Sequence, residues 1–119
     1  MSARERDLPL GPEPFRCVVT EERATAVVSL YGELDLATVP EVNALLASLA
    51  DTPSRLTLDL RGLDFMDSSG LRLVYELDQH AKERGVEFAV VPGGPRIQQV
   101  FAMTGLDRSV ELVDAPPDD

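Results

Sequence analysis

Two hydrophobic periods alternate along this chain, and their order restricts the folds that it can adopt. Leu56, Leu58 and Leu60 are separated by single polar residues, and this period of two predicts a strand with one buried face. Residues 42–49 place apolar side chains three and four positions apart, which predicts a helix with one buried stripe. Because strands and helices take turns, we expect parallel strands joined by right-handed helical crossovers.

The predicted elements follow one another as strand, strand, helix, strand, helix, strand, helix, strand. We expect a mixed, open α/β sheet of about five strands packed with about three helices, beginning with an antiparallel hairpin. The predicted strands lie near residues 15–19, 26–31, 56–60, 86–91 and 110–112, and the predicted helices lie near 38–49, 69–84 and 95–104.

Local signals set several of the predicted boundaries. Thr38 and Glu41 have the spacing of a capping box, in which the Thr38 hydroxyl accepts the Glu41 amide. The polar residues 21–23 predict the turn of the first hairpin, and Gly62 predicts a short connection after the third strand. Gly85 is placed to end a helix in the left-handed conformation.

The chain has the size of one domain. Its 119 residues, of which 44% are hydrophobic, suffice for one buried core and are too few for two. Residues 1–14 and 114–119 combine prolines with charged residues, a composition that buries little surface. We therefore expect a folded domain over residues 15–113 with a flexible tail on each side.

Charge and cysteine content exclude several function classes. Acidic residues outnumber basic residues 21 to 11, and the formal net charge is -10. Such a surface repels phosphate backbones and anionic lipid headgroups, so we expect neither direct nucleic-acid binding nor membrane binding.

Cys17 is the only cysteine, which excludes an internal disulfide and a cysteine-ligated zinc site. The sequence begins with no apolar leader and has no long apolar span, so we expect a cytoplasmic protein.

Polar residues cluster where the third predicted strand meets the second predicted helix. Asp67, Ser68 and Ser69 occupy this junction, and in open α/β sheets functional sites collect at the corresponding edge. Two interpretations stay open from spacing alone. The residues serve as helix caps, for which Asp and Ser are preferred, or they carry chemistry.

Enzymatic chemistry finds little support in the residues. Ser68 lacks the leading glycine of a G-x-S-x-G nucleophile elbow. His80, the only histidine, would lie roughly 18 Å from Ser68 along the same helix, which excludes a Ser-His dyad. The glycines within 92–95 are followed by no Lys-Ser or Lys-Thr pair, so turn chemistry explains them better than a phosphate loop. We expect no enzyme, no metal site and no cofactor.

A modification switch suits the junction better. A hydroxyl at a helix N-terminus is accessible to a kinase, and we expect the amides of residues 69–71 to be free to hold phosphate oxygens. Phosphate on Ser68 would add about -1.5 to -2 charges beside Asp67 and, if the strand ends adjoin, beside Asp35. A partner that offers its own carboxylate or nucleotide phosphate would then be repelled.

Two motifs give the chain a resemblance to a known family. They are Gly-Glu-Leu-Asp at residues 32–35 and Asp-Phe-Met-Asp-Ser-Ser-Gly-Leu at residues 64–71, with support from Met-Thr-Gly-Leu at 103–106. Over nearly all of residues 15–113, the chain resembles the STAS-domain anti-sigma-factor antagonists of bacterial partner-switching pathways. The resemblance implies a single STAS domain. Many relatives continue into one more C-terminal helix, whereas this chain ends in Ala-Pro-Pro-Asp-Asp.

The resemblance also implies a function and a set of partners. The unmodified protein would bind an anti-sigma factor that is also a serine kinase with a histidine-kinase-like ATPase fold, and would thereby release a sigma factor. Phosphorylation of Ser68 would abolish that binding, and a metal-dependent serine phosphatase would reverse it. The implied partner-binding residues are Asp35, Asp67, Ser69, Leu71 and Arg72.

Two alternatives to this hypothesis stay open. In one, the chain is a STAS scaffold whose Ser68 is not phosphorylated, working as a subunit of a stress-signalling or transporter-associated complex. In the other, Asp35 and Ser68 mark a site of nucleotide binding or hydrolysis. The second is weaker, because no base, phosphate loop or metal cluster accompanies those residues.

Overall fold

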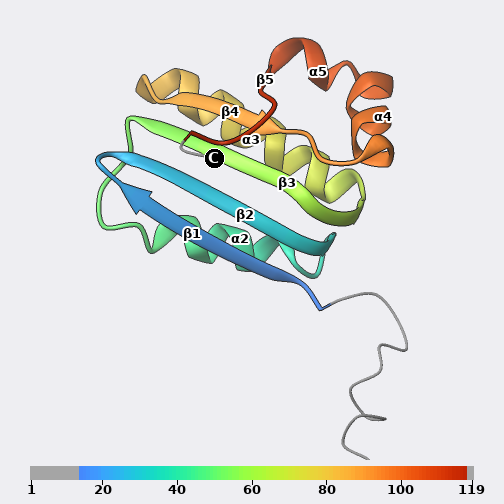
Figure 1. Cartoon of the computed structure of the whole chain (residues 1–119), viewed down its shortest axis with the longest axis horizontal. Helices are drawn as coiled ribbons and strands as arrows, with labels where there is room; N and C mark the ends of the chain where they lie inside the picture. Colours follow the sequence, from blue (N-terminus) through green and yellow to red (C-terminus); the bar gives the residue numbers. More distant parts are fainter. Residues whose placement is uncertain (1–13, 118–119) are drawn as a thin grey trace, which may run out of the picture.

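In the computed structural model, residues 14–117 are described, and they form a five-stranded sheet with helices packed against one face (Figure 1). The strand order is β1-β2-β3-β4-β5. The first pair is antiparallel and the other three pairs are parallel. The predicted mixed, open α/β sheet, including its initial hairpin, is therefore confirmed.

The elements have the order that the hydrophobic periods predict, with one addition. A short helix, α5, follows α4 directly; its four residues are too few to show a period in the sequence. The strands are β1 (Arg16–Glu22), β2 (Thr25–Leu34), β3 (Arg55–Met66), β4 (Glu87–Val91) and β5 (Glu111–Leu112), and the helices of the described part are α2 (Val39–Ala47), α3 (Ser68–Arg84), α4 (Pro95–Thr104) and α5 (Leu106–Ser109).

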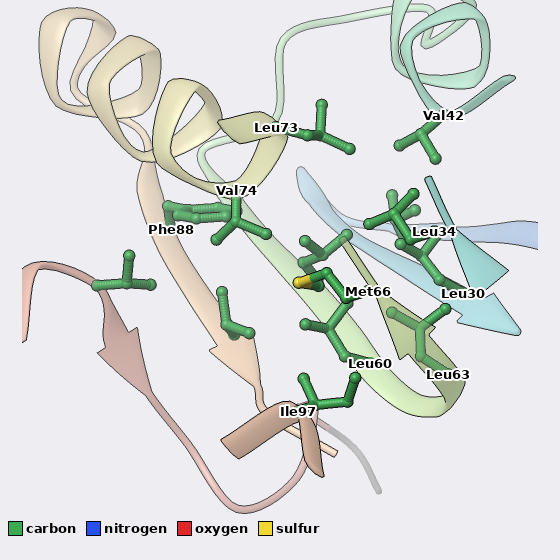
Figure 2. Close-up of a cluster of buried hydrophobic side chains, with 14 of the residues drawn as sticks. Leu30, Leu34, Val42, Leu60, Leu63, Met66, Leu73, Val74, Phe88 and Ile97 are labelled. Atoms are coloured by element: carbon green, nitrogen blue, oxygen red, sulfur yellow. The ribbon is translucent and has the colours of Figure 1, made fainter. Parts of the chain in front are cut away.

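The core lies between the sheet and the helices on one of its faces. In Figure 1, α2 and α3 lie behind the sheet, and α4 and α5 lie beyond β4. Figure 2 shows buried side chains from the sheet meeting side chains of three helices. The alternation in β2 and β3 and the helical stripes thus bury one common apolar surface, which is the main stabilising term of such a domain. The labelled members of this core are Leu30, Leu34, Val42, Leu60, Leu63, Met66, Leu73, Val74, Phe88 and Ile97.

The third strand is much longer than the sequence predicted. Gly62 does not open a connection, because β3 continues through it as far as Met66. The pairing with β2 shifts register twice along this extension, so β3 accommodates extra residues as bulges. A Cβ on Gly62 would lie 2.8 Å from the carbonyl oxygen of Leu30 and would meet the ring of Tyr31. The glycine is needed inside the strand because the neighbouring strand approaches so closely.

The first hairpin turns two residues later than predicted. Glu21 and Glu22 belong to β1, where they pair with β2. The turn consists of Arg23 and Ala24, with φ values of 52° and 65°. Two successive left-handed residues match the twist of an antiparallel hairpin. Neither residue is the Asn or Gly that usually occupies this conformation, so the sequence carried no signal for it.

The face of the sheet opposite α2 and α3 is partly covered by the chain that follows β5. Pro116 and Pro117 are half-buried and line a hollow on this face together with Tyr31 and Arg61. The predicted flexibility of residues 114–119 stays a prediction, and residues 118–119 lie outside the described residues. The same holds for residues 1–13 of the predicted N-terminal tail. Among residues 14–117, no helix is both long enough and apolar enough to cross a bilayer.

Relief of the strained hairpin should stabilise the domain. Ala24 has φ +65°, a conformation that disfavours any residue with a Cβ by roughly 1 to 2 kcal/mol. Ala24→Gly removes this strain but makes the unfolded chain more flexible, so we expect a net gain of about 0.5 to 1 kcal/mol in the free energy of unfolding. Urea denaturation would measure it. Ala44→Gly, on the exposed side of α2, is the control and should destabilise by about 1 kcal/mol. Equal losses in both variants would contradict the prediction.

Candidate functional site at the edge of β2 and β3

Strands β2 and β3 end side by side, and this brings the two predicted motifs together. Leu34, the last residue of β2, pairs with Met66, the last residue of β3. The amide of Asp67 then donates to the carbonyl oxygen of Leu34 at 3.2 Å. Asp35 and Ser68 therefore leave the sheet at the same edge, on neighbouring connections. This is the edge at which parallel sheets usually build their sites.

Asp67 caps helix α3. Its backbone is extended, and its Oδ1 accepts hydrogen bonds from the amides of Ser69 at 2.8 Å and Gly70 at 3.2 Å. The amide of Leu71 donates to the carbonyl oxygen of Asp67 at 3.1 Å. The prediction that residues 69–71 offer free amides to a phosphate is therefore wrong. Asp67 lies directly before the helix, so its carboxylate satisfies the Ser69 and Gly70 amides and its carbonyl oxygen satisfies the Leu71 amide within the unmodified protein.

Ser68 is exposed as the first residue of α3. Within residues 14–117, its hydroxyl takes part in no hydrogen bond, since Asp67 supplies the cap. The sequence left open whether these residues cap the helix or carry chemistry: Asp67 is the cap, and the exposed hydroxyl of Ser68 is not needed for it. Modification of this hydroxyl would break no hydrogen bond of the fold.

Gly70 lets the helix start close to the sheet. It is buried, and a Cβ at this position would lie 2.7 Å from Cγ of Met66 and 3.0 Å from Cγ of Leu34. Those two side chains lie near each other in the core shown in Figure 2. The helix therefore begins tightly against the strand ends, which holds Ser68 in a defined position at the surface.

The connection between β2 and α2 is held by a compact set of hydrogen bonds. Oδ1 of Asp35 accepts from the amides of Ala37 at 3.0 Å and Thr38 at 3.1 Å. The hydroxyl of Thr38 donates to the carbonyl oxygen of Glu33 and accepts from the amide of Asp35, both at 2.9 Å. The predicted capping box is wrong, because this hydroxyl bonds the preceding loop in place of the Glu41 amide. Its bonds fix the loop that carries Asp35.

The predicted partner-binding residues differ in accessibility. The side chain of Arg72 is 79% exposed and lies 3.6 Å from the carboxylate of Glu76. The other four, Asp35, Asp67, Ser69 and Leu71, are half-buried. All five lie on the two connections that leave this edge or on the first turns of α3, and their roles stay predictions.

Two exposed apolar side chains near this edge were missed by the sequence analysis. Leu36, which follows Asp35, is 76% exposed, and Phe65, which precedes Met66, is 46% exposed. Their exposure makes both side chains available for contact with another molecule. An apolar residue amid the polar loop was a usable signal for Leu36. Phe65 gave none, because only the bulged pairing of β3 decides which of its final residues face outward.

His80 takes no part in this site. It lies on α3 with Ser68, twelve positions along the helix, which corresponds to a separation of roughly 18 Å along the axis. It lines a hollow of about 440 Å³ between the later parts of α2 and α3. The structure thus confirms that Ser68 has no histidine base in its own chain.

Comparison with known proteins identifies the family. The family model described as "Mlab, STAS domain" matches residues 17–114. The chain belongs to the STAS-domain family. The match spans both connections of the candidate site and nearly the whole of the predicted domain. It agrees with the resemblance that the two sequence motifs carry.

Several relatives of this STAS domain are anti-sigma-factor antagonists. The anti-sigma-F factor antagonist RsfB of Mycobacterium tuberculosis is 28% identical over 103 residues, which cover 86% of this chain and 84% of RsfB. An anti-sigma factor antagonist from Mycobacterium paratuberculosis has a crystal structure that matches with a TM-score of 0.75 at 30% identity, covering 88% of this chain and 90% of that one. The family resemblance stated from the motifs is thereby confirmed.

The Bacillus antagonist SpoIIAA has been solved in two forms, and both match this STAS domain. The unphosphorylated form gives a TM-score of 0.71, with 88% of this chain and 90% of that chain covered. The phosphorylated form gives 0.67, with 88% and 94% covered. The identity is 25% in each case. A relative of this fold therefore exists both with and without phosphate.

Loss of the Asp67 cap should weaken α3 without changing the fold. Asp67→Ala leaves the amides of Ser69 and Gly70 without their acceptor, and we expect a loss of about 1 to 2 kcal/mol in the free energy of unfolding. Asp67→Ser, which keeps a capping oxygen, is the matched control and should lose much less. Urea denaturation of both variants would measure the difference. The assignment of the cap would be contradicted if the alanine variant were no less stable than the serine variant.

Proposed function

We propose that this STAS domain is an anti-sigma-factor antagonist that binds an anti-sigma factor when Ser68 is unmodified and releases it when Ser68 is phosphorylated. The observation that carries this proposal is the position of Ser68. Its hydroxyl is exposed at the edge where β2 and β3 end, while Asp67 performs the capping that the helix needs. In this role the chain regulates transcription by controlling a sigma factor and is not itself an enzyme.

The proposed binding surface surrounds Ser68. The loop with Asp35 is fixed by hydrogen bonds, and a surface that is already ordered loses less entropy on binding. Leu36 and Phe65 would add apolar contact area, which the predicted polar residues alone do not supply. Leu71 and Arg72 would extend the surface along α3.

The proposed modification is a phosphoryl transfer from ATP on the partner kinase. The Ser68 oxygen forms a bond to the γ-phosphorus while the bond between that phosphorus and ADP breaks. The hydroxyl proton passes to a base on the kinase, since His80 is too far away. In the reverse step, water attacks the phosphorus, the serine oxygen leaves and regains a proton, and inorganic phosphate is released. A metal-dependent serine phosphatase is the proposed catalyst of that step.

Added charge explains how the modification would change binding. Phosphate brings about -1.5 to -2 charges to a surface that already carries Asp67 and Asp35 and to a chain of net charge -10. A unit-charge pair at about 4 Å is worth roughly 1 kcal/mol in water and about 4 kcal/mol at an effective dielectric of 20. A partner with a carboxylate or a nucleotide phosphate opposite Ser68 would thus lose about tenfold or more in affinity.

The relatives support both states of this switch. SpoIIAA, an anti-sigma factor antagonist, is known in unphosphorylated and phosphorylated forms, and both superpose on this chain with similar TM-scores. The remaining parts of the proposal, a kinase with a histidine-kinase-like ATPase fold and a cytoplasmic location, follow from the same family. Neither nucleic acid nor a membrane is proposed as a direct partner, given the acidic surface.

Phosphorylation should be confined to Ser68. Incubation with a candidate serine kinase and ATP, followed by peptide mass mapping, should place one phosphate on Ser68 and none on the Ser68→Ala variant. Ser69→Ala is the matched control, because Ser69 is the adjacent, half-buried hydroxyl, and any phosphate that this variant accepts should still be on Ser68. Phosphate on Ser69, or on another residue, would reject the assignment.

Charge at position 68 should control binding while the fold stays intact. Ser68→Asp should bind the kinase about tenfold more weakly than Ser68→Asn, which has the same size without the charge. Both variants should unfold at nearly the same temperature as the native chain, because the Ser68 hydroxyl supports no hydrogen bond within the described residues. Isothermal titration calorimetry and thermal denaturation would measure the two effects.

The scaffold alternative makes different predictions in the same assays. A STAS subunit of a stress-signalling or transporter-associated complex would accept no phosphate on Ser68. Its binding to other subunits would also be equal for Ser68→Asp and Ser68→Asn. Absence of phosphate on Ser68 after incubation with a kinase that phosphorylates a related antagonist, or equal binding of the two variants to other subunits, would favour the scaffold over the switch.

A further inference from the structure

A phosphate on Ser68 needs donors, and the backbone amides of the next three residues are already used. Those of Ser69 and Gly70 donate to the carboxylate of Asp67, at 2.8 and 3.2 Å. The Leu71 amide donates to the Asp67 carbonyl oxygen at 3.1 Å. A phosphate would have to displace a charged cap in order to reach them, which costs part of the stability of α3. Beyond the amide of Ser68 itself, side chains are therefore the more accessible donors.

Arg72 is the one basic side chain in the first two turns of α3. It lies four positions after Ser68, and residues at this spacing have Cβ atoms about 5 to 6 Å apart on the same helix face. Its side chain is 79% exposed, and its only ion pair in the described chain is with Glu76, at 3.6 Å. An exposed pair of this kind contributes little, so Arg72 is able to change partners.

We propose that Arg72 is the counterion of phosphorylated Ser68, and that phosphorylation moves its guanidinium from Glu76 to the phosphate. The inference rests on the proposed function, since it concerns the modified state of the same serine. The ligand chemistry is a phosphate monoester, which a guanidinium binds through two parallel hydrogen bonds.

Helix geometry favours this exchange. In the present pair, the cation of Arg72 precedes the anion of Glu76 along the helix, which is the less favourable orientation. With phosphate on Ser68, the anion would precede the cation, and it would lie at the positive end of the helix dipole. The phosphate also carries about -1.5 to -2 charges against the single charge of Glu76.

The exchange gives phosphorylation a second effect on recognition. Unmodified protein presents Arg72 as an exposed cation beside the proposed binding surface. After modification, the guanidinium is held by the phosphate and is no longer offered to the acidic groups of a partner. One covalent change would then both add an anion and withdraw a cation, so the difference in affinity exceeds what the phosphate charge alone produces.

The second ionisation of the phosphate tests the inference. Full-length protein with phosphoserine installed at position 68 during synthesis is titrated by ³¹P NMR, in native form and with Arg72→Gln. An adjacent guanidinium favours the dianion, so the phosphate pKa, ordinarily about 6, should be roughly 0.2 to 0.4 higher in Arg72→Gln. Arg84→Gln makes the same charge change at the other end of α3, roughly 24 Å away, and should leave the pKa almost unchanged.

A double-mutant cycle tests the change of partner. Glu76→Gln should lower the phosphate pKa in the chain that keeps Arg72, because the competing carboxylate is gone, and it should have a smaller effect in the Arg72→Gln background. Equal pKa values in Arg72→Gln and Arg84→Gln would overturn the inference, as would a Glu76→Gln effect that is the same in both backgrounds. Because no kinase is used, failure of a kinase to modify Ser68 would reject the proposed function and leave this result untouched.

Discussion

The site depends on the way in which the ends of β2 and β3 are joined to the start of α3. The Asp67 amide donates to the last carbonyl oxygen of β2, and the Asp67 carboxylate accepts two amides of the helix. One residue thereby ties strand, strand and helix together. Gly70 allows the helix to sit directly on Leu34 and Met66. As a result, the backbone of Ser68 has a defined position, although the Ser68 side chain makes no hydrogen bond within the described residues.

Because the capping group and the accessible hydroxyl are on different residues, this edge is suited to a reversible covalent modification. A residue that holds the fold together cannot be modified without cost, because a buried or capping group that loses its partner destabilises the protein by about 1 kcal/mol or more. Here the structural role falls on Asp67 and the accessible hydroxyl is on the next residue. The second connection, which carries Asp35, is likewise closed by its own hydrogen bonds. Charge can therefore be added at Ser68 while the surrounding backbone remains in place.

Much of the fold followed from hydrophobic periods and from local residue signals. The order of the elements, the open mixed sheet and the left-handed glycine that ends α3 were all predicted correctly. The errors share a cause. The extension of β3 through Gly62, the shift of the hairpin turn from residues 21–23 to residues 23–24 and the hydroxyl contacts of Thr38 depend on neighbouring segments. A glycine or a capping-box spacing indicates only which backbone conformations and hydrogen bonds are possible at a residue. Tertiary contacts then select among them.

The sequence by itself determined the class of fold, the serine at the junction and the family motifs, because period and residue type are properties of the chain alone. Only the tertiary structure decided which groups at the junction have partners. It showed that the helix amides are occupied by Asp67, that Leu36 and Phe65 are exposed, and that Arg72 pairs with Glu76. Local spacing permits the Asp67 cap and the Arg72–Glu76 pair, but which permitted contacts form, and which side chains stay exposed, depends on how one element packs on another.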